Sequence, residues 1–163
     1  MGVLDCTEYI VQDTKEKPWN LYSWKHRSKA LKYEIVLHME QDLILWASGP
    51  WTGRTNDQGV FNQQLKNILE QNNEKLVSDS GYKGKYFINS LPISSDKDVR
   101  LHNWECRAIS ARLENVNARL KQFLCLKHPW RNQLNRHKIV FFVVLNILQM
   151  KLQYQPLRKR NIK

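Results

Sequence analysis

Cysteine is scarce in this chain, and the residues present form neither a disulfide framework nor a zinc motif. Among 163 residues the cysteines are Cys6, Cys106 and Cys125, an odd number with no pair at CxxC spacing. A disulfide-stapled secreted domain is therefore disfavoured, and a reducing interior is the expected setting. Cys125 with His128 and His137 lacks a fourth ligand at usable spacing, which also disfavours a zinc site.

A long hydrophobic run is also absent. The longest apolar run, residues 139–148, contains Asn146 and has ten residues, whereas a membrane-spanning helix needs about 20. The first residues contain neither a basic region nor a long apolar stretch, so we expect no secretory signal. With 42% hydrophobic and 25% charged residues, the composition predicts one folded globular domain and no membrane partner.

Acidic residues are nearly missing from the last third of the chain. Residues 107–163 hold 13 Lys and Arg and a single acid, Glu114, whereas residues 1–106 hold 13 Lys and Arg and 14 acids. The net charge of +11 indicates a polyanionic partner, nucleic acid first and an anionic membrane second. A solvated basic face is the plainer alternative. The candidate contacts to a DNA backbone are Lys121, Lys127, Arg131, Arg136 and Lys138.

Hydrophobic patterning predicts an α/β chain with an antiparallel opening. The predicted strands are residues 2–11, 30–40, 43–48, 75–79 and 87–91, and the predicted helices are residues 58–72, 109–124 and 136–152. Gly49, Pro50 and Gly53 predict a loop, with Asn56 or Asp57 as the N-cap of the next helix. The polar residues 94–102 predict another loop, and the last helix, apolar on most faces, is expected inside the core. The six tryptophans are expected mainly as core or loop anchors.

Three acids lie on separate predicted elements. Asp5 is in the first strand, Asp79 ends the fourth before a Ser-Gly turn, and Glu114 is in a helix opposite its apolar face. If the fold brings them together, their carboxylates would suit a hard cation such as Mg²⁺, and two such ions support phosphodiester hydrolysis. Ordinary strand-end, turn and surface-helix roles are the alternatives.

Several segments, taken in order, resemble the DDE transposases of the PIF/Harbinger group, which are related to bacterial insertion-sequence transposases. The segment around Asp79 (LVSDSGY) resembles the group's Asp-x-Gly-Tyr motif, and residues 111–123 (ARLENVNARLKQF) resemble its glutamate helix. Thirty-four residues separate Asp79 from Glu114. Residues 4–8 resemble the first-aspartate strand, residues 51–57 resemble the loop before the helix, and Trp130 with His137 fits the C-terminal segment.

The resemblance implies a fold, a site and an activity. The fold would be an RNase H-like mixed sheet flanked by helices over residues 1–154, with residues 155–163 a basic flexible tail. Asp5, Asp79 and Glu114 would be the catalytic ligands of two Mg²⁺ or Mn²⁺ ions, and Lys121 would hold phosphate. The activity would be metal-dependent cleavage of transposon-end DNA and strand transfer to a target. Asp57 recurs in the family's loop, but helix capping is the preferred interpretation.

Two departures from the family pattern leave other functions open. Asn115 follows the glutamate where many relatives carry arginine, and with four residues before Asp5 we expect the family's usual N-terminal helix-turn-helix region to be absent. A separate DNA-binding protein and a homo-oligomer are therefore expected partners, and a catalytically inactive DNA-binding scaffold or a non-functional fragment are alternatives. The expected location is the nucleus in a eukaryote and otherwise the cytoplasm or nucleoid. Residues 158–160 (RKR) fit either a nuclear-localisation patch or a solvated tail.

Overall fold

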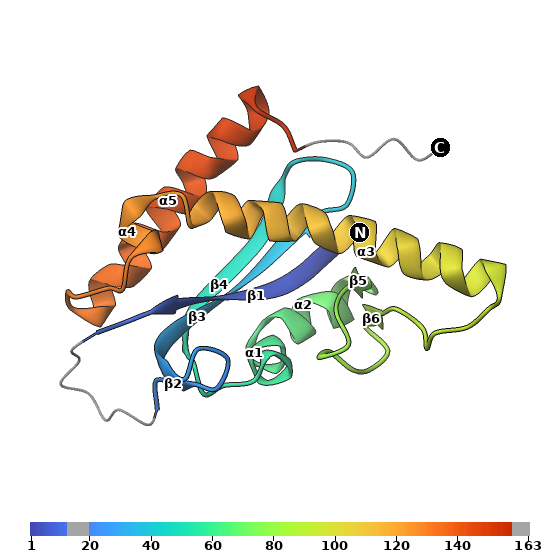
Figure 1. The fold of residues 1–163 in the computed structure, drawn as a ribbon, viewed down its shortest axis with the longest axis horizontal. Coiled ribbons are helices and arrows are strands. Elements are labelled where there is room, and N and C mark those ends of the chain that lie inside the picture. Colours follow the sequence, from blue (N-terminus) through green and yellow to red (C-terminus); the bar gives the residue numbers. More distant parts are fainter. Residues whose placement is uncertain (13–19, 158–163) are drawn as a thin grey trace.

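An open, mixed, six-stranded sheet flanked by helices forms the centre of the chain (Figure 1). The computed structural model describes residues 1–12 and 20–157. The strands are β1 (Gly2–Ile10), β2 (Tyr22–Ser23), β3 (Ser28–His38), β4 (Ile44–Thr52), β5 (Leu76–Val77) and β6 (Phe87–Ile88). The helices are α1 (Asp57–Gln63), α2 (Leu65–Asn72), α3 (Lys97–Leu120), α4 (Leu124–Lys127) and α5 (Leu134–Tyr154). This architecture confirms the α/β class and is consistent with an RNase H-like fold.

The central strand of the sheet is β1. It pairs antiparallel with β3 and parallel with β5, which in turn pairs parallel with β6, while β2 and β4 both pair with β3. Val3 is opposite Val77 in the parallel pair. Asp5 and Asp79 each lie two residues beyond that pair, Asp5 still within β1 and Asp79 past the end of β5.

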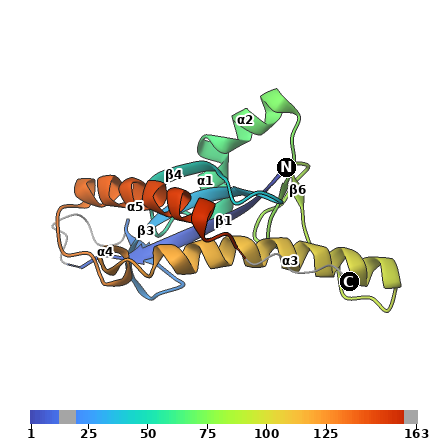
Figure 2. The same cartoon turned by 90° about the horizontal axis from the view of Figure 1, so that it is seen from above.

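Alternate residues of β1 and β3 build two cores on opposite faces of the sheet, as the two-residue period of a strand requires. One core joins residues such as Val3 and Tyr33 to α3 and α5. The other joins residues such as Leu4 and Val36 to α1 and α2. In Figure 1 the first pair of helices lies above the sheet and the second pair below it, and Figure 2 looks down onto α3 and α5. Asp5, two residues after Val3, therefore lies on the same face of the sheet as Val3, which is the face that α3 covers.

Three predicted elements differ from the structure. Strand β4 continues through Gly49 and Pro50, where a loop was predicted, because β4 pairs with β3 alone and an edge strand tolerates a residue without an N–H. The helix predicted over residues 58–72 is interrupted at Gln64, which separates α1 from α2. Helix α3 begins inside the predicted 94–102 loop because Asp96 caps it, accepting a 2.9 Å hydrogen bond from the Asp98 N–H.

Helix α5 is buried on one side only, so the expectation that it lies largely inside is only partly correct. Phe141, Val144 and Leu148 are buried in the core. The exposed apolar residues of the helix are Ile139, Val143, Ile147, Met150 and Tyr154. Among the residues that the structure describes, no helix is both long enough and apolar enough to cross a lipid bilayer.

Residues 155–157 pack against neighbouring elements. The Leu157 side chain is buried, and its N–H donates a 2.8 Å hydrogen bond to Asp42 Oδ2. The Arg119 guanidinium donates to the carbonyl oxygens of Gln155 and Pro156, at 2.6 and 3.2 Å. The proposed boundary between a domain and a tail after residue 154 stays a prediction, and residues 158–163, including the basic RKR segment, lie outside the described residues.

Candidate active site

Asp5 occupies the middle of the site because β1 is the central strand. Its Oδ1 accepts a 2.8 Å hydrogen bond from the Cys6 N–H, and its Oδ2 accepts a 3.0 Å hydrogen bond from the Asn117 side-chain amide. Burial is the main reason that the Asp5 pKa is raised to about 6. The Cys6 N–H opposes this rise, and the negative charges of Asp57 and Asp79 add to it.

Asp79 does not end the strand, as was predicted, because β5 stops at Val77; it lies two residues further on, exposed, in the turn that the Ser-Gly sequence predicts. Its Oδ1 accepts a 2.8 Å hydrogen bond from the Gly81 N–H, which fixes an Asx-type turn. The next residue, Tyr82, is fully buried, and its hydroxyl contacts Cys6 Sγ at 3.3 Å. The turn is thus anchored to β1, and the negative charge of Asp79 contributes to the raised pKa of Asp5.

Glu114 is on the exposed side of α3, while Leu113, Val116 and Leu120 are fully buried, as the helical spacing predicts. A helix beginning at residue 109 would place Glu114 in its first turns, but α3 begins at Lys97, so Glu114 lies in its second half. Glu114 precedes Asn117 by three residues, and residues at this spacing share a face of the helix. The observed contact from α3 to Asp5 comes from Asn117.

Sequence reasoning placed Asn117 beside Glu114 but missed its contact with Asp5. The three-residue spacing from Glu114 could have indicated this contact, because it puts Asn117 on the polar face of α3. Asn117 Oδ1 is buried and has no hydrogen-bond partner within the described part of the chain. An oxygen of this kind is a suitable donor for a hard cation.

The donors around Asp5 suit a divalent ion in their chemistry. Two carboxylates, Asp5 and Asp79, and the Asn117 amide oxygen are all hard oxygen ligands. In residues 1–12 and 20–157, however, no group of three or more His, Cys, Asp or Glu side chains is close enough together to hold a metal ion. The assignment of Asp5, Asp79 and Glu114 as a metal-binding triad stays a prediction.

Asp57 belongs to a buried ion-pair network next to this site. Its Oδ1 is 2.5 Å from the Lys32 ammonium, which is also 3.3 Å from Glu8 Oε1. Burial alone would lower the Lys32 pKa, but its hydrogen bond to Asp57 and the charges of both acids raise it instead. The expected capping role of Asp57 is wrong, because the cap is Asn56, whose Oδ1 accepts a 2.6 Å hydrogen bond from the Gly59 N–H.

Of the predicted DNA-binding residues, Lys121 is coupled to the carboxylate site. Burial and the charge of Lys25 lower the Lys121 pKa, and Asp5 opposes this effect. Its ammonium also lies over the Tyr9 ring, 5.6 Å from the centroid. The four other predicted residues are exposed on α4, on α5 or between them: Lys127, Arg131, Arg136 and Lys138. Their contact with DNA stays a prediction.

His137, once considered for a metal site, lies inside the core. Its Nδ1 is 2.8 Å from the Tyr33 hydroxyl, and burial lowers its pKa to about 4. Cys125 is exposed on α4. His137 is therefore a packed, hydrogen-bonded residue of the core.

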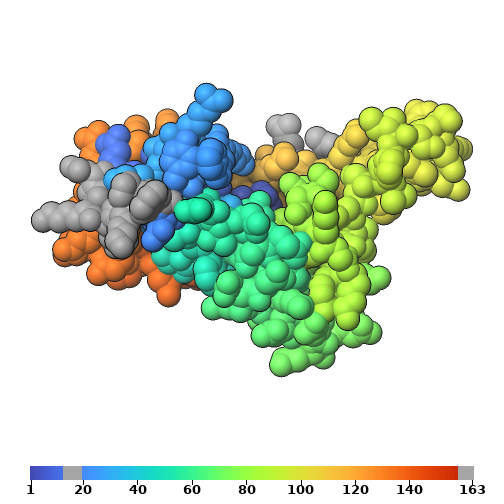
Figure 3. Space-filling view, turned by 90° about the horizontal axis from the view of Figure 1, so that it is seen from below, coloured from blue at the N-terminus to red at the C-terminus, as the bar shows by residue number. Residues whose placement is uncertain are grey.

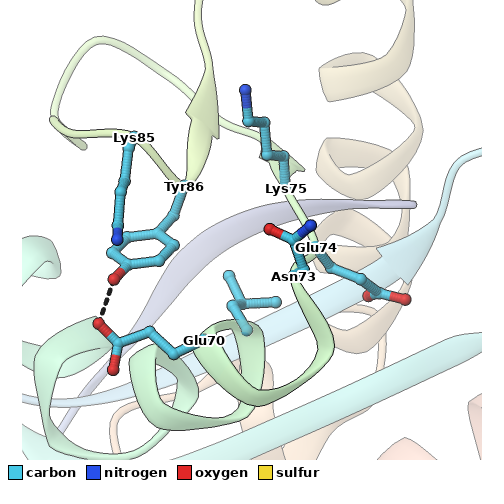
Figure 4. Close-up of a pocket in the computed structure, with 7 residues that line it drawn as sticks. Glu70, Asn73, Glu74, Lys75, Lys85 and Tyr86 are labelled. Atoms are coloured by element: carbon cyan, nitrogen blue, oxygen red, sulfur yellow. Dashed lines mark hydrogen bonds between the residues drawn. The ribbon is translucent and has the colours of Figure 1, made fainter.

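A hollow of about 560 Å³ lies between the end of α2 and the β5–β6 region (Figure 4). Its charged lining comes from Glu70, Glu74, Lys75 and Lys85, and the Tyr86 hydroxyl donates a hydrogen bond to Glu70. None of the predicted site residues lines it. A second hollow, of about 380 Å³, is lined by Asp57 and by Gly81 of the Asp79 turn, and so adjoins the carboxylate site.

Comparison with known proteins identifies the family. Residues 4–148 match the family described as DDE superfamily endonuclease. Over 143 residues the chain is 29% identical to the probable transposase for insertion sequence element IS702 of Microchaete diplosiphon, which covers 82% of this chain and 51% of the relative. The chain thus spans about half the length of that relative. No solved structure matches this chain. Because the family match extends over most of the sheet and all three predicted site residues, the chain belongs to the DDE superfamily endonucleases.

Proposed function

We propose that this chain is the catalytic domain of a transposase that cuts DNA by metal-dependent hydrolysis of a phosphodiester bond. The observation that carries the proposal is the position of Asp5. It follows the Val3–Val77 pair by two residues, as Asp79 does, and it accepts a hydrogen bond from Asn117 of the glutamate helix. A family of endonucleases and a net charge of +11 support DNA as the substrate.

Asp5, Asp79 and Glu114 would hold two Mg²⁺ or Mn²⁺ ions, which when bound activate water and stabilise the leaving oxygen. Asn117 orients the Asp5 carboxylate from α3, and the Gly81 N–H fixes the Asp79 carboxylate in its turn. Lys121 would hold a phosphate near Asp5. Hydrolysis frees a DNA 3′-hydroxyl, and its attack on a target phosphodiester would complete strand transfer.

We also propose that the chain is of the PIF/Harbinger type, on the motifs around Asp79 and Glu114. Pairing of two transposon ends would require a homo-oligomer, and a separate DNA-binding protein would supply sequence specificity. Lys127, Arg131, Arg136 and Lys138 would contact the DNA backbone beyond the cut site. The nucleus is the proposed location in a eukaryote, and the cytoplasm or nucleoid otherwise.

The test compares Asp79→Asn with Glu74→Gln in the full chain. An asparagine at position 79 keeps the oxygen that accepts the Gly81 N–H, so the turn is preserved while the negative charge is removed. Glu74 is an exposed carboxylate that lines the separate hollow of Figure 4 and serves as the matched control. The measurements are thermal unfolding with and without millimolar Mn²⁺, and nicking of a supercoiled plasmid.

We expect Mn²⁺ to stabilise the wild type and Glu74→Gln but not Asp79→Asn. Binding to the native state contributes about 2.7 kcal/mol at a hundredfold excess over Kd. Plasmid nicking should fall at least 100-fold in Asp79→Asn alone. Equal nicking by the two variants would overturn the assigned role of Asp79. Salt-dependent DNA binding without nicking by the wild type would favour the inactive scaffold, and the absence of cooperative unfolding would favour the non-functional fragment.

A further inference from the structure

The 380 Å³ hollow beside the carboxylate site is lined by an aromatic ring and two exposed cations that the proposed mechanism does not use, together with the ion pairs of Lys32 with Glu8 and Asp57. One wall is the turn after β2, which contributes Trp24 and Lys25, and the opposite wall is the loop before α1, which contributes Arg54. In the space-filling view of Figure 3, dark-blue atoms of β1 are visible between the blue β2 region, the teal loop and the gold part of α3. Glu8 of β1 and Gly81 of the Asp79 turn also line the hollow, so it adjoins the proposed cut site.

Trp24 departs from the expected role of a core or loop anchor. Its side chain is 78% exposed, more than any other tryptophan in the described part of the chain. Tyr22 contacts the indole edge-to-face, with ring centroids 5.1 Å apart, and so restrains its orientation. A large aromatic surface held open to solvent next to cations is the arrangement on which unpaired nucleobases stack.

Both walls of the hollow are fixed to the same buried lysine. The Ser23 hydroxyl donates a hydrogen bond to Glu8 and accepts one from the His26 N–H, which shapes the turn that carries Trp24. Glu8 pairs with Lys32, and the Lys32 ammonium also donates a 2.7 Å hydrogen bond to the Thr55 carbonyl in the opposite loop. The hollow is thus preorganised, which lowers the entropic cost of binding.

The charges of the hollow extend to the catalytic carboxylates. Lys25 influences the pKa values of both Asp5 and Lys121, so its ammonium lies within electrostatic reach of the reaction centre. Arg54 is exposed on the opposite wall. An aromatic ring with one cation on its own wall and a second cation on the facing wall suits the alternating bases and phosphates of a single DNA strand. The volume is in the range of small-ligand sites, about 300–1,000 Å³.

We propose that this hollow binds an unpaired DNA nucleotide next to the cut phosphate, with its base stacked on Trp24 and its phosphates contacting Lys25 and Arg54. The inference rests on the proposed function, because it requires a DNA substrate. It adds that the strand is locally unpaired at the site. Trp24 is then a substrate-binding residue on the β2 turn, far in sequence from the basic C-terminal third.

The experiment measures affinity by fluorescence anisotropy for two fluorescein-labelled DNA duplexes, with EDTA present so that no DNA is cut. One duplex is fully paired, and the other contains a short run of unpaired thymidines. The wild-type full chain should prefer the second by on the order of tenfold. Trp24→Ala should abolish this preference without weakening binding to the paired duplex. Trp24→Phe should retain most of it, because a phenyl ring also stacks.

Trp104→Ala is the matched control, since Trp104 is 40% exposed on α3 and does not line the hollow. It should keep the preference for unpaired DNA. If the wild type shows no preference for the unpaired duplex, or if Trp24→Ala keeps that preference, the inference is overturned. The proposal that the chain binds DNA would still stand in either case. Failure of the wild type to bind either duplex would overturn the DNA substrate itself, and with it both proposals.

Discussion

Glu34 makes the stability of the fold dependent on pH. It lies in the middle of β3, fully buried, and its Oε2 accepts hydrogen bonds from Trp46 Nε1 at 3.2 Å and Ser48 Oγ at 3.4 Å. Its other oxygen, Oε1, has no partner among the described residues. Burial is the main cause that raises the Glu34 pKa from its ordinary value of 4.5 to about 7, although the two hydrogen bonds act in the opposite direction.

The direction of the pH effect follows from proton binding. Between pH 4.5 and 7 the unfolded chain has already lost the Glu34 proton while the folded chain retains it. The folded state therefore binds more protons, and the free energy of unfolding falls as the pH rises through this range. At about 1.36 kcal/mol for each pKa unit, the ionised Glu34 destabilises the fold by about 3 kcal/mol above pH 7.

Glu34→Gln should remove this destabilisation. The amide oxygen of glutamine can accept the hydrogen bonds from Trp46 and Ser48, and no charge is then buried. Urea unfolding should show the variant more stable than the wild type by about 3 kcal/mol at pH 8, with a much smaller difference at pH 4.5. Asp5, with its raised pKa, contributes a slope of the same sign in both proteins, so their difference isolates Glu34. A variant equally or less stable at pH 8 would refute the reasoning.

Two further predictions concern ion pairing and packing. Lys32→Met should destabilise the fold by about 3 kcal/mol or more in urea unfolding, because Glu8 loses its buried counter-charge. The control, Lys83→Met on the surface, should change the stability little. Equal effects of the two substitutions would contradict a structural role for the ion pair. Val144→Ala should cost about 2 kcal/mol by removing buried methyl groups, whereas Val143→Ala, at a position 52% exposed, should remain within about 0.5 kcal/mol. Similar unfolding midpoints for these two alanine variants would contradict the assigned faces of α5.

The long elements could be predicted from sequence because their periodicity reflects burial. The alternation in β3 and the Leu113, Val116 and Leu120 spacing in α3 both correspond to buried faces. The start of α3 was missed because its first turns are polar and exposed, leaving the Asp96 cap as the main signal. Strand β4 was cut short because Pro50 breaks central strands, whereas the edge position of β4 depends on a sheet order that local patterning does not contain.

The site was predictable as separate residues, but its contacts depend on register. Asp5 opposite Ile35 and Glu8 opposite Lys32 follow from one antiparallel alignment of β1 with β3. A shift of one residue would reverse every face, and the sequence offered no independent measure of that alignment. The Lys32–Asp57 and Asn117–Asp5 contacts join residues 25 and 112 positions apart, so neither could be assigned before the fold was known.

The partners of the acidic side chains distinguish those that stabilise the fold from those available for chemistry. Glu8 and Asp57 share the charge of Lys32. Asp5 is instead hydrogen-bonded to neutral groups, the Cys6 N–H and the Asn117 amide, and neighbouring acids help burial to raise its pKa. A cation gains most where negative charge is least compensated. This difference in pairing supports the proposed role of Asp5 as a metal ligand, whereas Glu8, three residues later in the same strand, supports the walls of the adjacent hollow.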